Sequence, residues 1–438
     1  PAILERGVLK VTMDYNSTNY FVYRGQPMGF HLEMAQLFAN HLGVELEVYL
    51  SNNFEENISC LMTEGECDLI AMDLPVTRES REYLSFAKPH IQSEMVLVQR
   101  LPQGWHNLRS SEIEANLIRN QLDLAGKTVH VPNKSAFIQR LHNLMEEIGE
   151  PITIVAVDQS AEELIERVST GEIEYAISFG HVAHVNQNYF ANIDTQTPVS
   201  FSHNLSWAVR HDAPLLRAAI DAWMSEFTTT SQFSNLYARY FHNPRSLHMA
   251  RSQFHSLGGG KISIFDHLFQ HHADIIGWDW RLIASLAFQE SRFDSTAVSW
   301  AGAFGVMQLM PNTAAMFNVT PESPPAEHII AGIKYLYWID SRLRDIIVDD
   351  TERVKFVLAS YNVGLGHVLD ARRLAEKFGR NPNVWENNVD YFILNKSNPK
   401  YYLDPVVQHG FARGYEPYRF VIEILQRFEH YKNAIDRG

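Results

Sequence analysis

The order of apolar and polar positions divides the chain into two halves of different character. Up to about residue 243, short apolar runs alternate with helical patterns, in the order VLKVTMD, HLEMAQLFANHLG, VELEVYL, NISCLMTEG and CDLIAMDL. This alternation is typical of βαβ units, so we expect a mostly parallel sheet covered by helices. After about residue 262, amphipathic helical patterns follow one another without a convincing strand. The second half is therefore predicted to be all-α.

A polar, aperiodic segment at residues 243–263 separates the two halves. It contains three consecutive glycines at 258–260, which is typical of a flexible joint. We therefore predict a first domain at 1–245, a Gly-rich linker at 246–261 and a second domain at 262–438.

The first half has a subdivision of its own. Two apolar runs, MVLVQR (95–100) and SWAVR (206–210), flank a further βαβ stretch that includes KTVHVP, ITIVAV and EYAISFG. A chain that leaves one lobe, builds a second and returns has two crossover strands and a cleft between the lobes, where ligands usually bind. We expect lobe 1 at about 1–98 and 203–245, and lobe 2 at about 99–202.

Composition excludes some classes of partner. The 438 residues carry a formal net charge of −14, and no clustered Lys/Arg surface is visible, which argues against a nucleic-acid partner. No apolar run approaches the roughly 18–20 residues of a membrane-spanning helix. The chain begins PAILERGVLK without an initiator Met, so we expect that a leader or lipid anchor has been removed. The two cysteines, Cys60 and Cys67, are compatible with a local disulfide or with two buried thiols.

The stretch LIASLAFQESRFDSTAVSWAGAFGVMQLMP (282–311) carries one carboxylate, Glu290, into the interior of an apolar helix. A buried acid without a cationic partner stays protonated at neutral pH, which is the state of a general acid. Asp294 lies four residues on, but the helical pattern fails there, so it is predicted to end the helix. One functional carboxylate is therefore expected, with a pKa near about 6, as for comparable acids in apolar pockets.

The first half resembles the extracellular solute-binding proteins of the polar amino-acid type. The similar segments are GQPMGFHLEMAQLFANHLGVELEVY, GECDLIAMDLPVTRESREYLSFAKPH, DLAGKTVHVPNKSAF and LYARYF. The resemblance implies a two-lobed α/β periplasmic-binding-protein-like domain.

This sequence departs from that family at the positions that hold an amino-acid ligand. Relatives that bind amino acids usually have an acidic residue where His31 stands, an Arg where Ser80 stands and an Asp near Phe179. A zwitterion needs a fixed cation and a fixed anion, so a free amino acid fits poorly. A muropeptide or a cell-wall peptide is the ligand we expect in the cleft, if it holds one. The candidate contacts are Thr77, Arg78 and Arg81; the alternative is a helix start with solvated arginines.

The second half resembles the catalytic domain of the soluble lytic transglycosylases, which has an all-α lysozyme-like fold. Four motifs appear in the family's order: QES (289–291), GVMQLMP (305–311), SYNVG (360–364) and EPYRFV (416–421). Together with the first half, they make the chain similar to the membrane-bound lytic transglycosylase F family. The resemblance implies cleavage of the peptidoglycan bond between N-acetylmuramic acid and N-acetylglucosamine without water, giving 1,6-anhydro ends.

The resemblance also implies roles for particular residues. Glu290 would be the catalytic acid and base. The residues implied to bind the glycan strand or to lie beside the acid are Ser291, Met307, Gln308, Met310, Tyr361, Asn362 and Glu416. For Met307 and Met310 the alternative is that they fill core space, with one of them lining the cleft, and for Tyr361 the alternative is that it only packs.

Two further expectations follow for cofactors and location. His267 and His271 lie one helical turn apart, but no third ligand accompanies them, so we predict no metal and no other cofactor. The expected location is the periplasm, with a lipid anchor to the outer membrane that this chain does not contain. Two alternatives stay open: a muramidase of the same fold that uses water, and a non-catalytic peptidoglycan-binding sensor.

Overall fold

The computed structural model describes residues 2–16, 18–63, 65–78, 80–133, 135–242 and 260–435. The predicted linker at 246–261 lies outside the described residues apart from its last two positions. The chain forms two units, one of residues 1–21 and 28–259 and the other of residues 22–27 and 260–438. No helix in the described ranges is long and apolar enough to cross a membrane.

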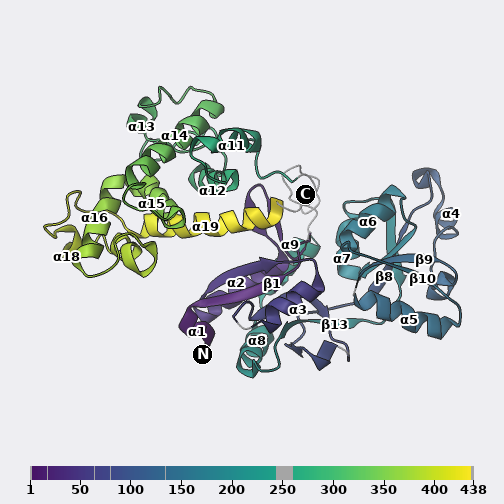
Figure 1. The fold of residues 1–438 in the computed structure, drawn as a ribbon. Coiled ribbons are helices and arrows are strands. Elements are labelled where there is room, and N and C mark those ends of the chain that lie inside the picture. Colours follow the sequence, from purple (N-terminus) through teal and green to yellow (C-terminus); the bar gives the residue numbers. More distant parts are fainter. Residues whose placement is uncertain are drawn as a thin grey trace. The chain divides into compact units, whose positions relative to one another are not determined.

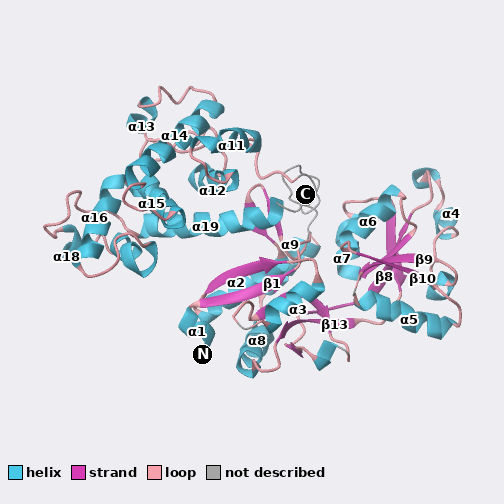
Figure 2. Cartoon of the chain, viewed as in Figure 1, coloured by secondary structure: helices cyan, strands magenta, loops and turns pink. Residues whose placement is uncertain are grey.

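Lobe 1 of the first unit is built on a sheet in the order β4-β1-β5-β13-β6, with β7 also paired to β13 (Figures 1 and 2). Its strands are β1 (Val8–Met13), β4 (Glu45–Leu50), β5 (Leu69–Pro75), β6 (Ser85–Phe86), β7 (Ile91–Ser93) and β13 (His203–Val209). Its helices are α1 (Ala2–Arg6), α2 (Phe30–Leu42), α3 (Phe54–Met62), the 3-10 turn η1 (Ser80–Glu82), α8 (Pro214–Phe227) and α9 (Ser231–Phe241). Strand β1 is parallel to β4 and β5, as the βαβ pattern predicts, whereas the returning strand β13 is antiparallel to β5.

Lobe 2 carries a second sheet in the order β10-β9-β11-β8-β12. Its strands are β8 (Met95–Arg100), β9 (Thr128–Pro132), β10 (Thr153–Val157), β11 (Tyr175–Phe179) and β12 (Ile193–Pro198). Its helical elements are η2 (Trp105–Asn107), α4 (Ser110–Glu114), η3 (Gln121–Leu124), α5 (Ala136–Ile148), α6 (Ala161–Thr170) and α7 (Gly180–Gln187). Two apolar clusters belong to this lobe, one centred on Leu97, Val129 and Leu141 and the other on Val98, Leu164 and Ala176. Because neighbouring residues of β8 fall into different clusters, both faces of the sheet are buried.

The second unit is helical. Its elements are α11 (Asp266–His272), η4 (Ala273–Ile275), α12 (Trp280–Ser291), α13 (Pro311–Ala315), α14 (Pro325–Leu343), α15 (Asp350–Val363), α16 (Leu365–Lys377), the π-turn η5 (Trp385–Val389), α17 (Asp390–Leu394), α18 (Pro399–Tyr402) and α19 (Tyr415–Ile435). Helix α19 packs against α12, α15 and α17. Together the two units confirm the predicted fold class, a two-lobed α/β domain followed by an all-α domain.

A short hairpin from the N-terminal part of the chain belongs to the helical unit. It is formed by β2 (Phe21–Tyr23) and β3 (Gln26–Met28), of which residues 22–27 group with the second unit. The Tyr431 hydroxyl donates a hydrogen bond to the Gly25 carbonyl at 2.6 Å. A Cβ at Gly25 would lie 2.7 Å from the Phe293 ring and 2.9 Å from the Phe288 ring, and the φ of +76° also favours glycine. Only glycine therefore fits this close approach.

Cys60 and Cys67 form a disulfide, which resolves the choice that the sequence left open. It joins the end of α3 to the segment before β5.

Candidate active site

Glu290 lies in the last turn of α12, a helix whose core is enclosed on all sides. Every residue from 282 to 288 is buried, and the helix starts at Asp279, whose side chain accepts the Arg281 backbone N–H. The helix ends where Arg292 and Phe293 adopt left-handed backbone angles, with φ of 53° and 66°. This turn places Asp294 outside the helix, exposed, with its carboxylate accepting from the Thr296 backbone and hydroxyl. As the sequence predicted, the helix that carries Glu290 does not continue past Asp294.

Helix α19 holds the end of α12 in place. The Gln289 side chain donates to Glu423 at 2.7 Å and accepts from Arg427 at 2.9 Å. The Arg427 guanidinium also lies over the Phe288 ring, 4.5 Å from its centroid. These contacts fix the residues immediately before Glu290, so the direction of its side chain is set by packing and by a polar network.

Burial raises the pKa of Glu290 to about 8. No hydrogen bond or ion pair to Glu290 is seen among the described residues that would offset the loss of hydration. The acid is therefore protonated at neutral pH, as a general acid must be, and its pKa lies above the value near 6 that we expected from sequence.

The pKa of Glu290 predicts how activity depends on pH. If Glu290 is the general acid that the sequence indicates, the reaction needs its protonated form, and kcat/KM should fall as the pH rises through about 8. The measurement is the initial rate of release of soluble fragments from peptidoglycan between about pH 3 and about pH 10, with thermal melting as a check of folding. An alkaline limb with its midpoint near the ordinary Glu pKa of about 4.3 would contradict the burial argument.

Tyr361 links the acid to the loop that follows α12. It is buried in α15, and its hydroxyl donates to the Met307 carbonyl at 2.7 Å. Burial, reinforced by the charge of nearby Glu290, raises the pKa of Tyr361 well above its usual value. This phenol therefore keeps its proton and serves as a neutral hydrogen-bond donor near the acid.

The side chains of Ser291 and Gln308 donate hydrogen bonds to backbone carbonyls of the same loop. The Ser291 hydroxyl donates to the Val306 carbonyl at 2.8 Å. The Gln308 amide donates to the carbonyls of Ala297 and Gly305, both at 2.9 Å, from a residue whose own φ is 47°. Both side chains therefore maintain the shape of the loop beside the acid.

A pocket of about 240 Å³ opens beside this loop. It is lined by Gln308, Leu309, Met310, Thr313, Tyr335, Tyr361, Asn362, Val363 and Gly364. Four of the residues predicted from sequence, Gln308, Met310, Tyr361 and Asn362, thus come together in its wall. Glu290 and Ser291 do not line it themselves, whereas Tyr361, whose pKa is raised in part by the charge of Glu290, does.

Two residues named from sequence lie elsewhere. Met307 is completely buried, and a Cβ at Gly332 would lie 2.7 Å from it, so it fills the core between the loop and α14. Glu416 is exposed at the start of α19, 3.9 Å from Arg413. Sequence reasoning missed Tyr335, whose ring packs 5.3 Å from that of Tyr361. The helical periodicity of α14 indicates a buried face at most, and it does not show that this face borders a pocket.

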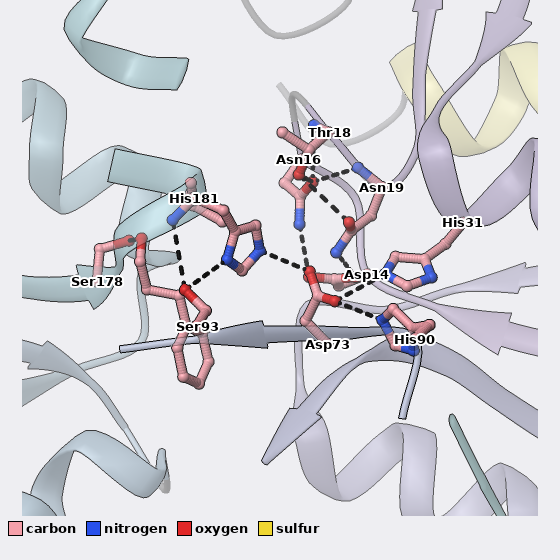
Figure 3. Close-up of polar contacts among 12 residues, drawn as sticks. Asp14, Asn16, Thr18, Asn19, His31, Asp73, His90, Ser93, Ser178 and His181 are labelled. Carbon is pink, nitrogen blue, oxygen red and sulfur yellow. Dashed lines mark hydrogen bonds and ion pairs between the residues drawn. The ribbon is translucent and has the colours of Figure 1, made fainter. Parts of the chain in front are cut away.

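The first unit contains a second polar site, and it does not involve the predicted arginines. Thr77 bonds Ser80 through its backbone N–H and its hydroxyl, in a turn that starts η1, while Arg78 and Arg81 are exposed. The residues that come together instead are Asp73, His31, His90 and His181, the Asp73 cluster (Figure 3).

The carboxylate of Asp73 accepts from all three imidazoles. His90 Nε2 lies 2.8 Å and His31 Nε2 3.1 Å from Oδ1, and His181 Nε2 lies 2.9 Å from Oδ2. Burial alone would raise the pKa of Asp73, but the imidazoles of His31 and His181 hold it well below its usual range. Because Asp73 ends up on β5 of lobe 1 and His181 on α7 of lobe 2, the Asp73 cluster joins the two lobes across the cleft.

Hydrogen bonding settles the tautomer of His31. The Trp207 indole donates to His31 Nδ1 at 2.9 Å, and an indole N–H is only a donor, so His31 is neutral with its hydrogen on Nε2. The ligand atoms of His31, Asp73 and His90 lie within 4.8 Å of one another, as in a metal site. However, a metal would need the electron pair of His31 Nε2, which holds the hydrogen. The cluster therefore fits a hydrogen-bonded carboxylate better than a metal centre.

Comparison with known proteins finds a family match for each half of the chain. Residues 9–243 match the family of bacterial extracellular solute-binding proteins, family 3, and residues 267–384 match the Transglycosylase SLT domain. The membrane-bound lytic murein transglycosylase F of Desulfosudis oleivorans is 32% identical over 428 residues, covering 98% of this chain and 90% of that protein. The membrane-bound lytic murein transglycosylase F 1 of Alkalilimnicola ehrlichii is 30% identical over 441 residues, covering 100% of this chain and 85% of that protein.

Solved structures were also compared with this chain. The ancestral amino acid-binding protein AncCDT-1, a precursor of cyclohexadienyl dehydratase, has a TM-score of 0.46 and 20% identity, and covers 55% of this chain and 98% of its own. The P235GK mutant of ArgBP from T. maritima has a TM-score of 0.47 and 21% identity, and covers 55% of this chain and 98% of its own.

A solute-binding unit joined to an SLT-type helical unit with a buried acid defines a modular cell-wall lytic enzyme. Given the identity and coverage of its relatives, the chain belongs to the membrane-bound lytic murein transglycosylase F family. It is a peptidoglycan lytic transglycosylase with an N-terminal solute-binding module. The sequence-based assignment is thereby confirmed, and the alternative of a non-catalytic sensor is set aside.

Proposed function

We propose that Glu290 alone supplies the acid and the base of the lytic reaction. The observation that supports this role is the burial that raises its pKa to about 8 without an offsetting partner. Asp294, the nearest acid in sequence, is exposed and bonded to Thr296, so it is not a candidate for the second carboxylate of a two-acid glycosidase.

The reaction then has two steps. Glu290 gives its proton to the glycosidic oxygen as the bond from C1 of the muramyl residue breaks, and the carbonyl oxygen of the 2-acetamido group bonds to C1. The Glu290 carboxylate next takes the proton of the C6 hydroxyl, whose oxygen bonds to C1 and displaces the acetamido oxygen. The products are a free N-acetylglucosamine hydroxyl and a 1,6-anhydromuramyl end, and no water is consumed.

The supporting residues act through the loop and the pocket. Tyr361 and Ser291 hold the loop at 305–310 beside the acid, and Gln308, Met310 and Asn362 offer surface to the glycan in the pocket. The alternative mechanism is that of a muramidase, in which water bonds to C1. Digestion in water enriched in ¹⁸O separates the two, because only hydrolysis places the heavy oxygen in the cleaved sugar.

For the N-terminal module, we propose a muropeptide or a cell-wall peptide as the ligand of the cleft. The match to solute-binding proteins supports a ligand-binding role. The Asp73 cluster is one carboxylate contacted by three imidazoles, which differs from the fixed cation and fixed anion expected for a free amino acid. Isothermal titration of the full-length Glu290→Gln variant with purified muropeptides should show binding. Binding of free amino acids alone would contradict this choice of ligand.

We propose a periplasmic location with attachment to the outer membrane; the words "membrane-bound" and "murein" in the names of the relatives support association with a membrane near the cell wall. Fractionation of cells that express the natural protein would test it, with an enzymatic assay of each membrane fraction.

A further inference from the structure

An exposed apolar patch lies on the turn that follows the catalytic helix. The Trp300 side chain is 94% exposed and Val298 is 68% exposed, and two methionines further on, Met310 and Met316, are 46% and 56% exposed. Single exposed apolar residues are ordinary, but Val298 and Trp300 are exposed within one turn, and Val298 also lines an apolar pocket, which is typical of a binding surface.

The turn that carries Trp300 is rigid. The Ser299 N–H donates to the Ala303 carbonyl at 2.8 Å, and the Gly302 N–H donates to the Ser299 carbonyl at 2.9 Å. The Ala303 N–H also donates to the Ser299 hydroxyl at 3.0 Å. Because the backbone is fixed before any partner arrives, little conformational entropy is lost when a ligand packs on the indole.

Val298 of this segment lines a second pocket. This pocket of about 310 Å³ has a mainly apolar wall that includes Val298, Gly302, Phe304, Pro311 and Ala315. Met310 lines the catalytic pocket and its neighbour Pro311 lines the second one. Gln308, which also lines the catalytic pocket, bonds the carbonyls of Ala297 and Gly305 at the two ends of the Trp300 segment. The Trp300 turn is thus held by a residue of the catalytic pocket.

The charge of this region favours a neutral partner. Residues 293–333 contain no Lys or Arg and include the acids Asp294, Glu322 and Glu327. Anionic lipid surfaces attract basic segments, so a membrane would gain no electrostatic attraction here. A saccharide has apolar ring faces and needs no such charge.

We propose that Trp300 and the second pocket form a distal saccharide subsite of the glycan groove. A sugar ring packs on the indole, and an N-acetyl methyl group enters the apolar pocket beneath it. Since the enzyme acts on a polymer, a subsite away from the cleaved bond would strengthen binding of long strands without taking part in the chemistry. Trp300 is accordingly a positioning residue.

The test compares Trp300→Ala, Trp300→Phe and the unchanged chain on purified glycan strands and on a short muropeptide that fills the catalytic pocket alone. For Trp300→Ala, we expect KM for long strands to rise about tenfold with kcat nearly unchanged, and no effect on the short substrate. Trp300→Phe should restore most of the loss. Phe201→Ala is the matched control, because Phe201 is 93% exposed in the other unit, and it should change neither constant.

A second measurement separates a glycan from a membrane as the partner. Co-sedimentation of the same variants with vesicles of phosphatidylethanolamine and phosphatidylglycerol should show no dependence on Trp300. Loss of vesicle binding with an unchanged KM for long strands would overturn the saccharide subsite, and so would equal KM values for all variants on long strands.

Discussion

Glu290→Gln is expected to lower turnover of peptidoglycan by about a thousandfold or more, because general acid and general base catalysis by one residue are lost together. Glutamine has nearly the shape of a protonated glutamic acid and carries no charge. Since Glu290 has a pKa of about 8 in the folded chain, its side chain is already protonated and uncharged at neutral pH. Glutamine resembles that protonated side chain. The variant should therefore fold and bind glycan while it fails to cleave.

The matched control for this prediction is Asp294→Asn. Asp294 is exposed and bonds only local groups of Thr296, so its loss should change turnover little. Release of soluble fragments from purified peptidoglycan gives the rates, and thermal melting checks that both variants are folded. A loss for Asp294→Asn as large as that for Glu290→Gln would contradict a mechanism with one carboxylate.

Asp370→Ala is expected to destabilise the helical unit by about 3–5 kcal/mol, the usual effect of removing one partner from a buried ion pair. Asp370 is fully buried and pairs with the equally buried Lys396 at 2.9 Å. Its carboxylate also accepts the backbone N–H groups of Gln408 and His409, at 2.8 and 2.9 Å. Without the acid, the buried ammonium group of Lys396 is left unpaired, and the N–H groups of Gln408 and His409 lose their acceptor.

The pKa of Asp370 gives the same prediction a dependence on pH. Burial opposes its ionisation, but the N–H of Gln408 and the ammonium of Lys396 outweigh it, and the pKa lies below its usual value. A depressed pKa contributes stability that is present above the unfolded value of about 3.9 and is lost as the pH falls through the folded value. The difference between the unchanged chain and Asp370→Ala should therefore shrink in acid.

Denaturant unfolding of the full chain would measure this loss, with Glu416→Gln as the control. Glu416 is exposed and only 3.9 Å from exposed Arg413, so its loss should change the free energy of unfolding by well under about 1 kcal/mol. A double variant, Asp370→Leu with Lys396→Met, should recover part of the stability because the ammonium group is no longer left buried, while the N–H groups of Gln408 and His409 and the guanidinium of Arg373 still lose their partner. A loss below about 1 kcal/mol for Asp370→Ala would show that solvent reaches this pair.

The catalytic unit could be predicted well from sequence because its signals are local. Glu290 and the residues around it belong to one continuous stretch, whose apolar pattern indicates a buried helix and whose small polar residues after Ser291 indicate its end. Residues that are close together along this stretch are therefore also close together in the fold. The sequence left two possibilities for Met307, core packing and contact with the glycan; its neighbours Gln308 and Met310 line the pocket, while Met307 itself is buried in the core.

The Asp73 cluster could not be predicted in this way. Its four residues come from positions 31, 73, 90 and 181, on separate elements of two lobes, and each is unremarkable within its own segment. Only the folding of β5, α2 and α7 around the cleft brings them together. The sequence did indicate that His31 replaces an acid of the relatives, but it could not show that the acid is supplied by Asp73.

The hairpin at 22–27 illustrates the same limit for domain organisation. Continuity of the chain suggested one first domain from residue 1 to 245, yet Gly25 packs on Phe288, Phe293 and Tyr431 and groups with the helical unit. More than 400 residues separate Gly25 from Tyr431. Such a contact depends on a close fit of surfaces, and no periodicity or motif within the hairpin reveals it.

The most direct test of the mechanism is mass spectrometry of the fragments that the protein and its Glu290→Gln variant release from purified peptidoglycan. If Glu290 acts alone as acid and base, the fragments end in 1,6-anhydromuramic acid and are absent with the variant. Fragments with hydrated reducing ends from the unchanged chain, or anhydro fragments released equally by Glu290→Gln, would contradict it.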